Sequence, residues 1–196
     1  MADAAKRTVL KGQDAIDLWQ QGADAWNAWV AENPVADVDF SGVDFTKYGG
    51  VSFAEFRFPN GKKDFSETVF GDGNVRFYDA TSGEGDVSFF GATFGDGDVS
   101  FEGATFGVGA VSFIDAIFDA GSISFRGTIF GKGVITFADA ILGKGSLIFD
   151  DASFKENSIV FRNADINGHL RLQNCRNTKT LRILSFRAMR LTGTFI

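Results

Sequence analysis

Residues 99–122 read VSFEGATFGVGAVSFIDAIFDAGS, and this stretch holds two copies of one twelve-residue unit. In each copy a Val stands two positions before a Phe, while Ala stands three positions and a second Phe five positions after that Phe. Apolar residues that alternate with polar ones are typical of short β-strands, and Gly residues between them are typical of bends. Repetition of such a unit predicts a solenoid of short strands.

The unit recurs without a gap along most of the chain. Its first Phe is found ten times at intervals of twelve residues: Phe53, Phe65, Phe77, Phe89, Phe101, Phe113, Phe125, Phe137, Phe149 and Phe161. The row five positions later is Phe58, Phe70, Ser82, Phe94, Phe106, Phe118, Phe130, Leu142, Phe154 and Ile166. The row of branched aliphatic residues two positions before the first Phe is interrupted by Lys63. These rows predict a core of Phe rings, which need no buried hydrogen-bond partner.

Each unit divides into two five-residue words and a two-residue spacer, as in Val99-Ser-Phe-Glu-Gly, Ala104-Thr-Phe-Gly-Val and Gly109-Ala. These words resemble those of pentapeptide-repeat proteins, with Phe at the central, inward position and a small or branched residue two positions before it. The stretch Trp26-Asn-Ala-Trp-Val-Ala-Glu-Asn-Pro, followed by Asp39-Phe-Ser-Gly, resembles the helical cap and first coil of that family. The resemblance covers about residues 22–166 and departs from the family in the recurring spacers. It implies an all-β fold, a right-handed parallel β-helix with four-sided coils and a short N-terminal helical cap.

A coil could contain one unit or two. Packed sheets lie about 10 Å apart, and a ring of twelve residues could scarcely enclose two Phe, a Val and an Ala. We therefore favour a quadrilateral solenoid with two twelve-residue repeats per coil, in which Phe53, Phe77 and Phe101 form one ladder and Phe65, Phe89 and Phe113 the opposite one. The Gly pairs at the bends, such as Gly95 with Gly97 and Gly131 with Gly133, are predicted to supply positive φ angles.

The chain is expected to divide into four segments. Residues 1–12 are predicted to be disordered or extended, and residues 13–34 to form a helical cap, because Ile16, Trp19, Ala23, Trp26 and Val30 follow helical spacing. The Trp side chains of this cap are expected to plug the first coil. Residues 35–168 form the β-solenoid of twelve-residue repeats. After Ile166 the register slips, so residues 169–196 are a degenerate last coil, a C-terminal cap or a dimer surface.

The residue types argue against catalysis and metal binding. One His, His169, and one Cys, Cys175, cannot form a catalytic triad or a metal cluster from the usual groups. The corner Gly95-Asp-Gly-Asp resembles calcium-binding Gly/Asp repeats, but the equivalent corner Gly131-Lys-Gly-Val has no carboxylate. We therefore expect a protein that is not an enzyme, with no catalytic, cofactor or metal site and no cofactor.

Charge is unevenly distributed, although the net charge is -6. Among their charged residues, residues 64–156 are mostly acidic, whereas residues 162–196 are mostly basic.

No apolar run is long enough for a membrane helix, the start lacks a secretory signal, and a lone Cys fits a reducing compartment. We expect a cytoplasmic, non-enzymatic repeat scaffold or protein-interaction module with an unidentified protein partner. We expect no direct nucleic-acid binding and no membrane contact, and the C-terminal end could form a homodimer.

Two other functions are weighed. The family resemblance implies an acidic DNA mimic that binds DNA gyrase or a similar nucleic-acid enzyme, with a stripe formed by Asp72, Glu84, Asp86, Asp96, Asp98 and Glu102. A minor alternative is ice binding through rows of outward hydroxyl groups. These rows are Ser88, Ser100, Ser112, Ser124 and Thr136, and Thr81, Thr93 and Thr105.

Overall fold

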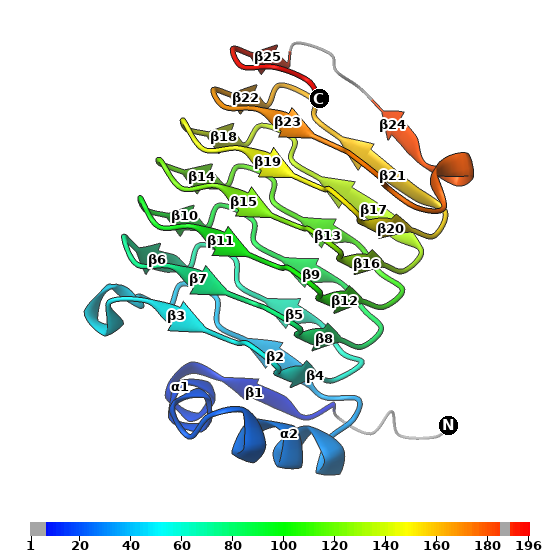
Figure 1. The fold of residues 1–196 in the computed structure, drawn as a ribbon. Coiled ribbons are helices and arrows are strands. Elements are labelled where there is room, and N and C mark those ends of the chain that lie inside the picture. Colours follow the sequence, from blue (N-terminus) through cyan, green and yellow to red (C-terminus); the bar gives the residue numbers. More distant parts are fainter. Residues whose placement is uncertain (1–6, 185–188) are drawn as a thin grey trace.

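The protein is a right-handed parallel β-helix closed at its N-terminal end by two short helices (Figure 1). The structure, a computed structural model, describes residues 7–184 and 189–196. The chain winds through four parallel sheets, here called A to D, and visits them in the order C, D, A and B in each coil. The predicted fold class is therefore confirmed.

Short strands build the four sheets. Sheet A contains β1 (Val9–Lys11), β2 (Asp37–Asp39), β5 (Lys63–Asp64), β9 (Val87–Ser88), β13 (Val111–Ser112), β17 (Gly133–Thr136), β21 (Asn157–Val160) and β24 (Arg182–Leu184). Sheet B contains β6 (Val69–Gly71), β10 (Thr93–Phe94), β14 (Ile117–Phe118), β18 (Ile141–Leu142), β22 (Asp165–Ile166) and β25 (Arg190–Leu191). Sheet C contains β3 (Val51–Ser52), β7 (Val75–Arg76), β11 (Val99–Ser100), β15 (Ile123–Ser124), β19 (Leu147–Ile148) and β23 (Leu170–Arg171). Sheet D contains β4 (Arg57–Phe58), β8 (Thr81–Ser82), β12 (Thr105–Phe106), β16 (Ile129–Phe130) and β20 (Ser153–Phe154).

One coil contains 24 residues, which is two sequence units. Val99 pairs with Val75 on one side and with Ile123 on the other, so neighbouring strands are one coil apart in sequence. The register changes near the C-terminus, where Leu147 pairs with Leu170 and Asp165 with Arg190. These pairings are 23 and 25 residues apart and agree with the register slip that the sequence indicates after Ile166. The last segment, residues 169–196, therefore adds β23, β24 and β25 to three of the sheets.

Stacked Phe rings fill the coil. The centroid of the Phe101 ring lies 4.9 Å from that of Phe77 and 4.8 Å from that of Phe125, with nearly parallel planes. The opposite ladder has the same geometry, since Phe113 lies 4.9 Å from both Phe89 and Phe137. The two ladders meet edge to face, which is a favourable contact between aromatic rings. The predicted ladders are thus confirmed, and the interior is a continuous aromatic column.

Close packing between coils explains the Gly residues at the corners. A Cβ atom on Gly121 would lie 1.9 Å from the carbonyl oxygen of Gly97, and one on Gly97 would lie 2.4 Å from that of Gly73. Gly97 itself, like Gly95 and Gly131, does not have a positive φ angle. The prediction of positive φ is therefore wrong for these three residues, because they are needed where one coil's backbone touches the next.

Positive φ angles occur instead two positions after each Phe of the first row. The residues there are Glu55, Glu67, Asp79, Gly91, Gly103, Asp115, Gly127, Asp139, Asp151 and Asn163, with φ between 51° and 67°. This left-handed conformation is strained for a residue with a Cβ atom, although Asp and Asn tolerate it better than most. The turn inside each repeat therefore carries backbone strain wherever it lacks Gly.

Replacing Glu67 by Gly is expected to stabilise the protein. The substitution relieves the strain at φ 57°, which outweighs the greater flexibility of Gly in the unfolded chain, for a gain of about 0.5–1 kcal/mol. Urea denaturation followed by circular dichroism measures the difference. Glu67→Ala is the control, because it removes the same carboxylate and keeps the strain, so it should give no gain. An equal gain in both variants would assign the effect to charge.

Two helices, α1 (Gly12–Gln20) and α2 (Ala23–Glu32), cover the first coil, and their polar side chains bond to its free strand edges (Figure 1). The indole nitrogen of Trp19 donates to the carbonyl oxygen of Ser52 at 2.8 Å, and that of Trp26 donates to Arg57 at 2.9 Å. Asn27 accepts from the amide nitrogen of Arg57 at 2.7 Å. These contacts take the place of a preceding strand.

The N-terminal segment and the cap differ slightly from their expected bounds. Residues 1–12 include β1, which pairs with β2 and extends sheet A, while residues 1–6 lie outside the described residues. The cap consists of two helices separated at Gly22, and α2 ends before Pro34. A short 3₁₀ helix, η1 (Thr46–Tyr48), and another, η2 (Thr178–Thr180), lie near the two ends of the solenoid.

Candidate interaction surface

The six carboxylates of the predicted acidic stripe do not lie together. Glu84 and Asp86 lie at the corner between β8 and β9, where sheet D passes to sheet A. Asp72, Asp96 and Asp98 lie at the diagonally opposite corner, where sheet B passes to sheet C. Glu102 lies in the turn between β11 and β12, on a third edge. The structure thus divides the predicted stripe among three edges.

Three of these carboxylates bind neighbouring coils. The Oδ1 atom of Asp86 accepts from the backbone nitrogen of Ala110 at 2.8 Å, and that of Asp98 accepts from Ser122 at 2.8 Å. Glu102 accepts a hydrogen bond from the hydroxyl of Ser124 at 2.7 Å. An acceptor at these spacer positions satisfies a backbone N–H of the following coil, which gives Asp86 and Asp98 a role in the fold that charge alone does not explain.

The hydroxyl rows are also divided. Ser88, Ser112 and Thr136 lie on the outer face of sheet A, whereas Ser100 and Ser124 lie on that of sheet C. In the Thr row, Thr81 and Thr105 belong to sheet D and Thr93 to sheet B. Each face therefore carries only every second member of a row that looks continuous in the sequence.

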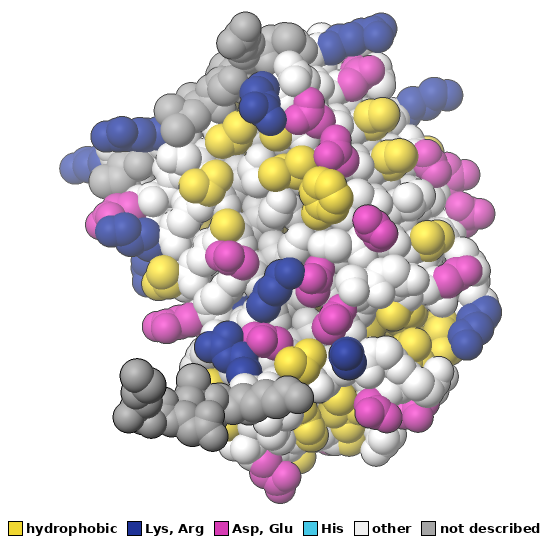
Figure 2. All heavy atoms as spheres, turned by 180° about the vertical axis from the view of Figure 1, so that it is seen from behind, with side chains coloured by type: hydrophobic (Ala, Val, Ile, Leu, Met, Phe, Trp, Pro, Cys, Tyr) yellow, Lys and Arg dark blue, Asp and Glu magenta, His cyan; other side chains and the backbone are white. Residues whose placement is uncertain are grey.

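An apolar stripe runs along the outer face of sheet B. Val69, Thr93, Ile117 and Ile141 occupy equivalent positions on four successive coils. The three aliphatic side chains are 37%, 38% and 47% exposed. Phe90, in the turn that precedes β10, is a further exposed ring. Figure 2, which shows the molecule from behind, has hydrophobic side chains at several places on the surface, with charged groups among them. We call Val69, Thr93, Ile117 and Ile141 the sheet B stripe.

In comparisons with known proteins, no family model and no curated protein matches this chain. Within the described ranges, none of the helices has the length and apolar character required to cross a lipid bilayer. The function of the surface must therefore be argued from its own geometry.

Sequence reasoning missed the sheet B stripe because it compared positions twelve residues apart. At that interval Thr93, Thr105, Ile117 and Ile129 form one mixed row, and the row alternates between sheets B and D. Comparison at an interval of 24 residues separates the two faces. It then gives Val69, Thr93, Ile117 and Ile141 on one sheet and Arg57, Thr81, Thr105, Ile129 and Ser153 on another.

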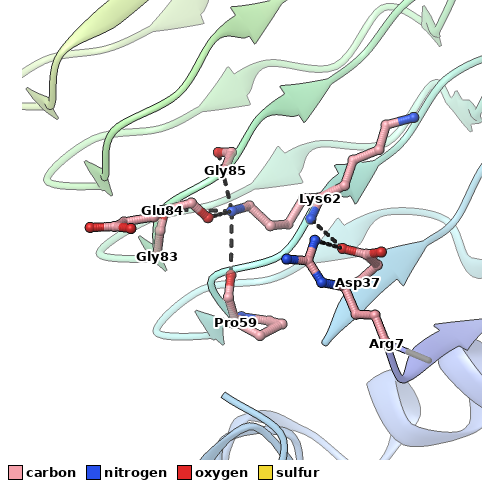
Figure 3. Close-up of polar contacts among 8 residues, drawn as sticks. Arg7, Asp37, Pro59, Lys62, Gly83, Glu84 and Gly85 are labelled. Atoms are coloured by element: carbon pink, nitrogen blue, oxygen red, sulfur yellow. Dashed lines mark hydrogen bonds and ion pairs between the residues drawn. The ribbon is translucent and has the colours of Figure 1, made fainter. Parts of the chain in front are cut away.

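Lys63, which interrupts the aliphatic row, is buried in a cage of backbone carbonyl groups. Figure 3 labels the residues that supply these groups, Pro59, Gly83, Glu84 and Gly85. Its ammonium group donates to the carbonyl oxygen of Glu84 at 2.7 Å and lies 3.3–3.4 Å from those of Pro59, Gly83 and Gly85. Burial lowers the pKa of Lys63 to about 8, so the group is charged at neutral pH. These contacts join two coils at the corner between sheets D and A.

His169 and Cys175, which the sequence analysis considered for catalysis and metal binding, make ordinary structural contacts. The Nδ1 atom of His169 lies 2.6 Å from the hydroxyl of Thr194, and the thiol of Cys175 donates to the carbonyl of Phe149 at 3.1 Å. Burial raises the pKa of the Cys175 thiol, which disfavours the reactive thiolate. Among residues 7–184 and 189–196, no group of three His, Cys, Asp or Glu side chains could hold a metal ion.

The interior has room for about one water molecule at the place where the ring ladder is broken. Ser82 replaces a Phe of sheet D between Phe58 and Phe106, and a void of about 20 Å³ lies beside it. The void is lined almost entirely by apolar side chains. A space of this size is too small for an organic substrate, which directs attention to the outer faces.

Proposed function

We propose that this protein is a non-enzymatic interaction module, a rigid rod that presents the sheet B stripe to a protein partner. One observation carries the proposal, namely that three aliphatic side chains, Val69, Ile117 and Ile141, are exposed at equivalent positions of sheet B, with half-buried Thr93 between the first two. Exposed apolar side chains gathered on one face are a common feature of protein-binding sites. The stripe lies on a filled solenoid, so little conformational entropy is lost when a partner binds.

The same repeat pattern supports a relationship with pentapeptide-repeat proteins. The support consists of two five-residue words per unit, a four-sided coil of four words, and a helical N-terminal cap. The two-residue spacers at the corners distinguish this chain from the simple five-residue pattern. In keeping with this relationship, we propose a scaffold role in the cytoplasm.

Partner capture with paired surface variants tests the proposal. The double variant Ile117→Asp with Ile141→Asp places charge in the sheet B stripe, where both side chains are exposed, so the fold should persist. Capture of specific partners from native lysate should fall at least about tenfold, because a partner would have to bury two unpaired carboxylates.

Ile129→Asp is the matched control for this experiment. Ile129 is 41% exposed at the equivalent position of sheet D, so its substitution changes charge and hydropathy without touching the stripe. Wild-type capture by Ile129→Asp supports the sheet B stripe. If Ile129→Asp loses partner capture and the double variant keeps it, the binding surface is on sheet D. Equal capture by all three proteins would contradict both surfaces.

A second candidate function is that of an acidic mimic of DNA, and it is supported by a group of carboxylates at one corner of the rod. Asp72, Asp96, Asp98 and Asp119 are all exposed at the corner between sheets B and C. A salt-titrated DNA gyrase supercoiling assay tests this role. Inhibition that weakens with salt, and that Asp72→Asn with Asp96→Asn reduces, would support it. Unchanged supercoiling at micromolar protein would exclude gyrase as the target.

A further inference from the structure

The outer face of sheet B has carboxylates along both of its borders. Its strands β6, β10 and β14 and the turns beside them are formed by residues 66–72, 90–96 and 114–120, which include no Lys or Arg. These segments contain five exposed acidic residues, none of which forms an ion pair with any residue that the structure describes: Glu67, Asp72, Asp96, Asp115 and Asp119. Glu67 and Asp115 lie in turns between sheets A and B, and the other three lie at the corner between sheets B and C. The face is therefore acidic on both sides of the sheet B stripe.

A hollow of about 560 Å³ lies between the stripe and one of these borders. Val69 and Thr93 of the stripe line it together with Asp72 and Asp119. The Asp72 carboxylate lies over Gly95 of the next coil, where the absence of a Cβ atom leaves space for it. A Lys or Arg side chain suits such a place, because its methylene groups pack on apolar atoms while its charged group reaches a carboxylate.

The interval between coils discriminates among the segments that could lie along this face. β6, β10, β14 and β18 follow one another along the rod, so the four stripe residues lie at about 0, 4.8, 9.6 and 14.4 Å (Figure 1). Residues i, i+3, i+7 and i+10 of an α-helix share one side and lie at about 0, 4.5, 10.5 and 15 Å along its axis. Alternate residues of a β-strand lie about 6.7 Å apart, so the fourth of them would be about 6 Å out of step. The spacing therefore favours a helix aligned with the rod.

The charges exclude a second copy of the same face as the preferred partner. Two sheet B faces would have identical coil spacing, but their contact would bring two sets of acidic borders together, and like charges oppose such a contact. A segment with basic side chains on both sides of an aliphatic row has the complementary charge.

We propose that the partner segment at the sheet B stripe is a basic amphipathic α-helix that lies along the rod. Its aliphatic side chains contact Val69, Ile117 and Ile141, and its Lys or Arg side chains reach the acidic borders. Phe90, exposed at the edge between sheets A and B, adds apolar contact in the coil where Thr93 is half-buried. This inference rests on the proposed function, since it names the kind of partner that the same surface binds.

Binding of designed peptides to the full chain, followed by fluorescence anisotropy, tests this proposal. The probe is a peptide of about 18 residues with Leu in the i, i+3, i+7, i+10 pattern, Lys on both sides of the Leu row and Ala elsewhere. One control peptide has Glu in place of Lys, and another has the composition of the probe with Leu alternating with other residues, as in a strand. The probe should bind with a micromolar dissociation constant, and both controls should bind at least about tenfold more weakly. Absence of probe binding, or equal binding of either control peptide, would overturn the proposal.

Substitutions in the stripe locate the bound probe. The double variant Ile117→Asp with Ile141→Asp should raise the dissociation constant of the probe at least about tenfold. Ile129→Asp, at the equivalent exposed position of sheet D, should leave it unchanged. Equal weakening by Ile129→Asp would show that the peptide binds without regard to the face and would overturn the assignment to sheet B.

Substitutions of carboxylates test the borders. Asp72→Asn with Asp119→Asn should weaken probe binding at least about threefold in about 50 mM NaCl and should reduce its dependence on salt. Glu55→Gln with Glu84→Gln is the matched control, because it removes two exposed carboxylates that lie at other edges of the rod. Equal weakening by both pairs would assign the effect to net charge and would contradict the proposed contact.

The lysate capture experiment separates failure of this inference from failure of the proposed function. A partner captured through the sheet B stripe should be displaced by the probe peptide. If the probe does not bind while capture still falls in the Ile117→Asp and Ile141→Asp variant, the stripe binds a partner of different chemistry, and the helix proposal alone is wrong. If the probe does not bind and capture is the same in all variants, both proposals are wrong.

Discussion

Gly121→Ala is expected to destabilise the protein by about 3 kcal/mol or more, at the upper end of the range for overpacked interiors. The new Cβ atom would lie 1.9 Å from the carbonyl oxygen of Gly97 in the neighbouring coil. Backbone atoms form this obstacle, so no side-chain rotation can relieve it. The coils would have to separate, and the hydrogen bonds and ring stacks on either side of the corner would weaken with them.

Urea denaturation followed by circular dichroism measures the loss, and Gly127→Ala supplies its control. Gly127 has a φ angle of 64°, but a Cβ atom there would have no neighbour within 4 Å. That variant should therefore lose only about 1 kcal/mol, the cost of the left-handed conformation. Equal stability of the two variants would contradict the explanation by contact between coils.

Trp26→Ala is expected to cost about 3–5 kcal/mol and to promote aggregation. Trp26 is fully buried, lies over Phe40 at a centroid distance of 6.0 Å, and donates to the carbonyl of Arg57. Its removal leaves a cavity at the end of a Phe ladder and an unsatisfied acceptor on β4. The exposed strand edge would then be available to another chain.

Thermal and urea denaturation measure the stability of this variant, and light scattering measures its aggregation. Trp29→Ala is the control, since Trp29 lies on the same helix and is only half-buried. Trp29→Ala should cost less than half as much and should not aggregate. If both substitutions cost the same, the two Trp side chains would contribute by burial alone, and the role of Trp26 as a plug for the first coil would be wrong.

The core could be predicted from the sequence because its determinants are periodic. The spacing of the repeats and the volume of the Phe rings were enough to predict that Phe53, Phe77 and Phe101 lie in one ladder. The volume of the inward side chains also favoured a coil of 24 residues over one of twelve residues. The helical character of the cap could be predicted in the same way, because Trp19, Trp26 and Val30 have helical spacing and Pro34 follows.

The outer surface was harder to predict because consecutive repeats lie on opposite sides of the rod. Glu84 and Asp96 are twelve residues apart and look equivalent in sequence, yet they lie at diagonally opposite corners. An acidic stripe read along the sequence is thereby divided in space. The sheet B stripe remained hidden for the same reason, since its members alternate with residues of sheet D.

Polar groups that bind the backbone could not be predicted from residue types. Lys63 looks like a defect in an aliphatic row, but its ammonium group is satisfied by carbonyl groups of a corner that only the folded coils create. Asn27 has no distinctive sequence pattern, yet it bonds to both Glu55 and Arg57 as a neighbouring strand would. In both cases the partner is main chain, whose position depends on the fold itself.

The two-residue spacers lie at corners where the backbones of neighbouring coils approach closely. Gly73, Gly97, Gly121 and Gly145 form a column in which each Cβ position is blocked by the preceding carbonyl group. Asp98 lies beside this column and accepts from the backbone of Ser122. The spacers are therefore part of the packing between coils.

The distance between two spin labels tests the central claim most directly, namely that one closed coil of parallel strands contains 24 residues. Labels at Ser52 and Ile148, in a Cys175→Ser background, lie on the outer face of sheet C and are separated by four coils. Double electron–electron resonance should give a narrow distribution near about 19 Å, from about 4.8 Å per coil. A distance of about 38 Å, as twelve-residue coils would give, or a broad distribution would contradict the 24-residue parallel coil.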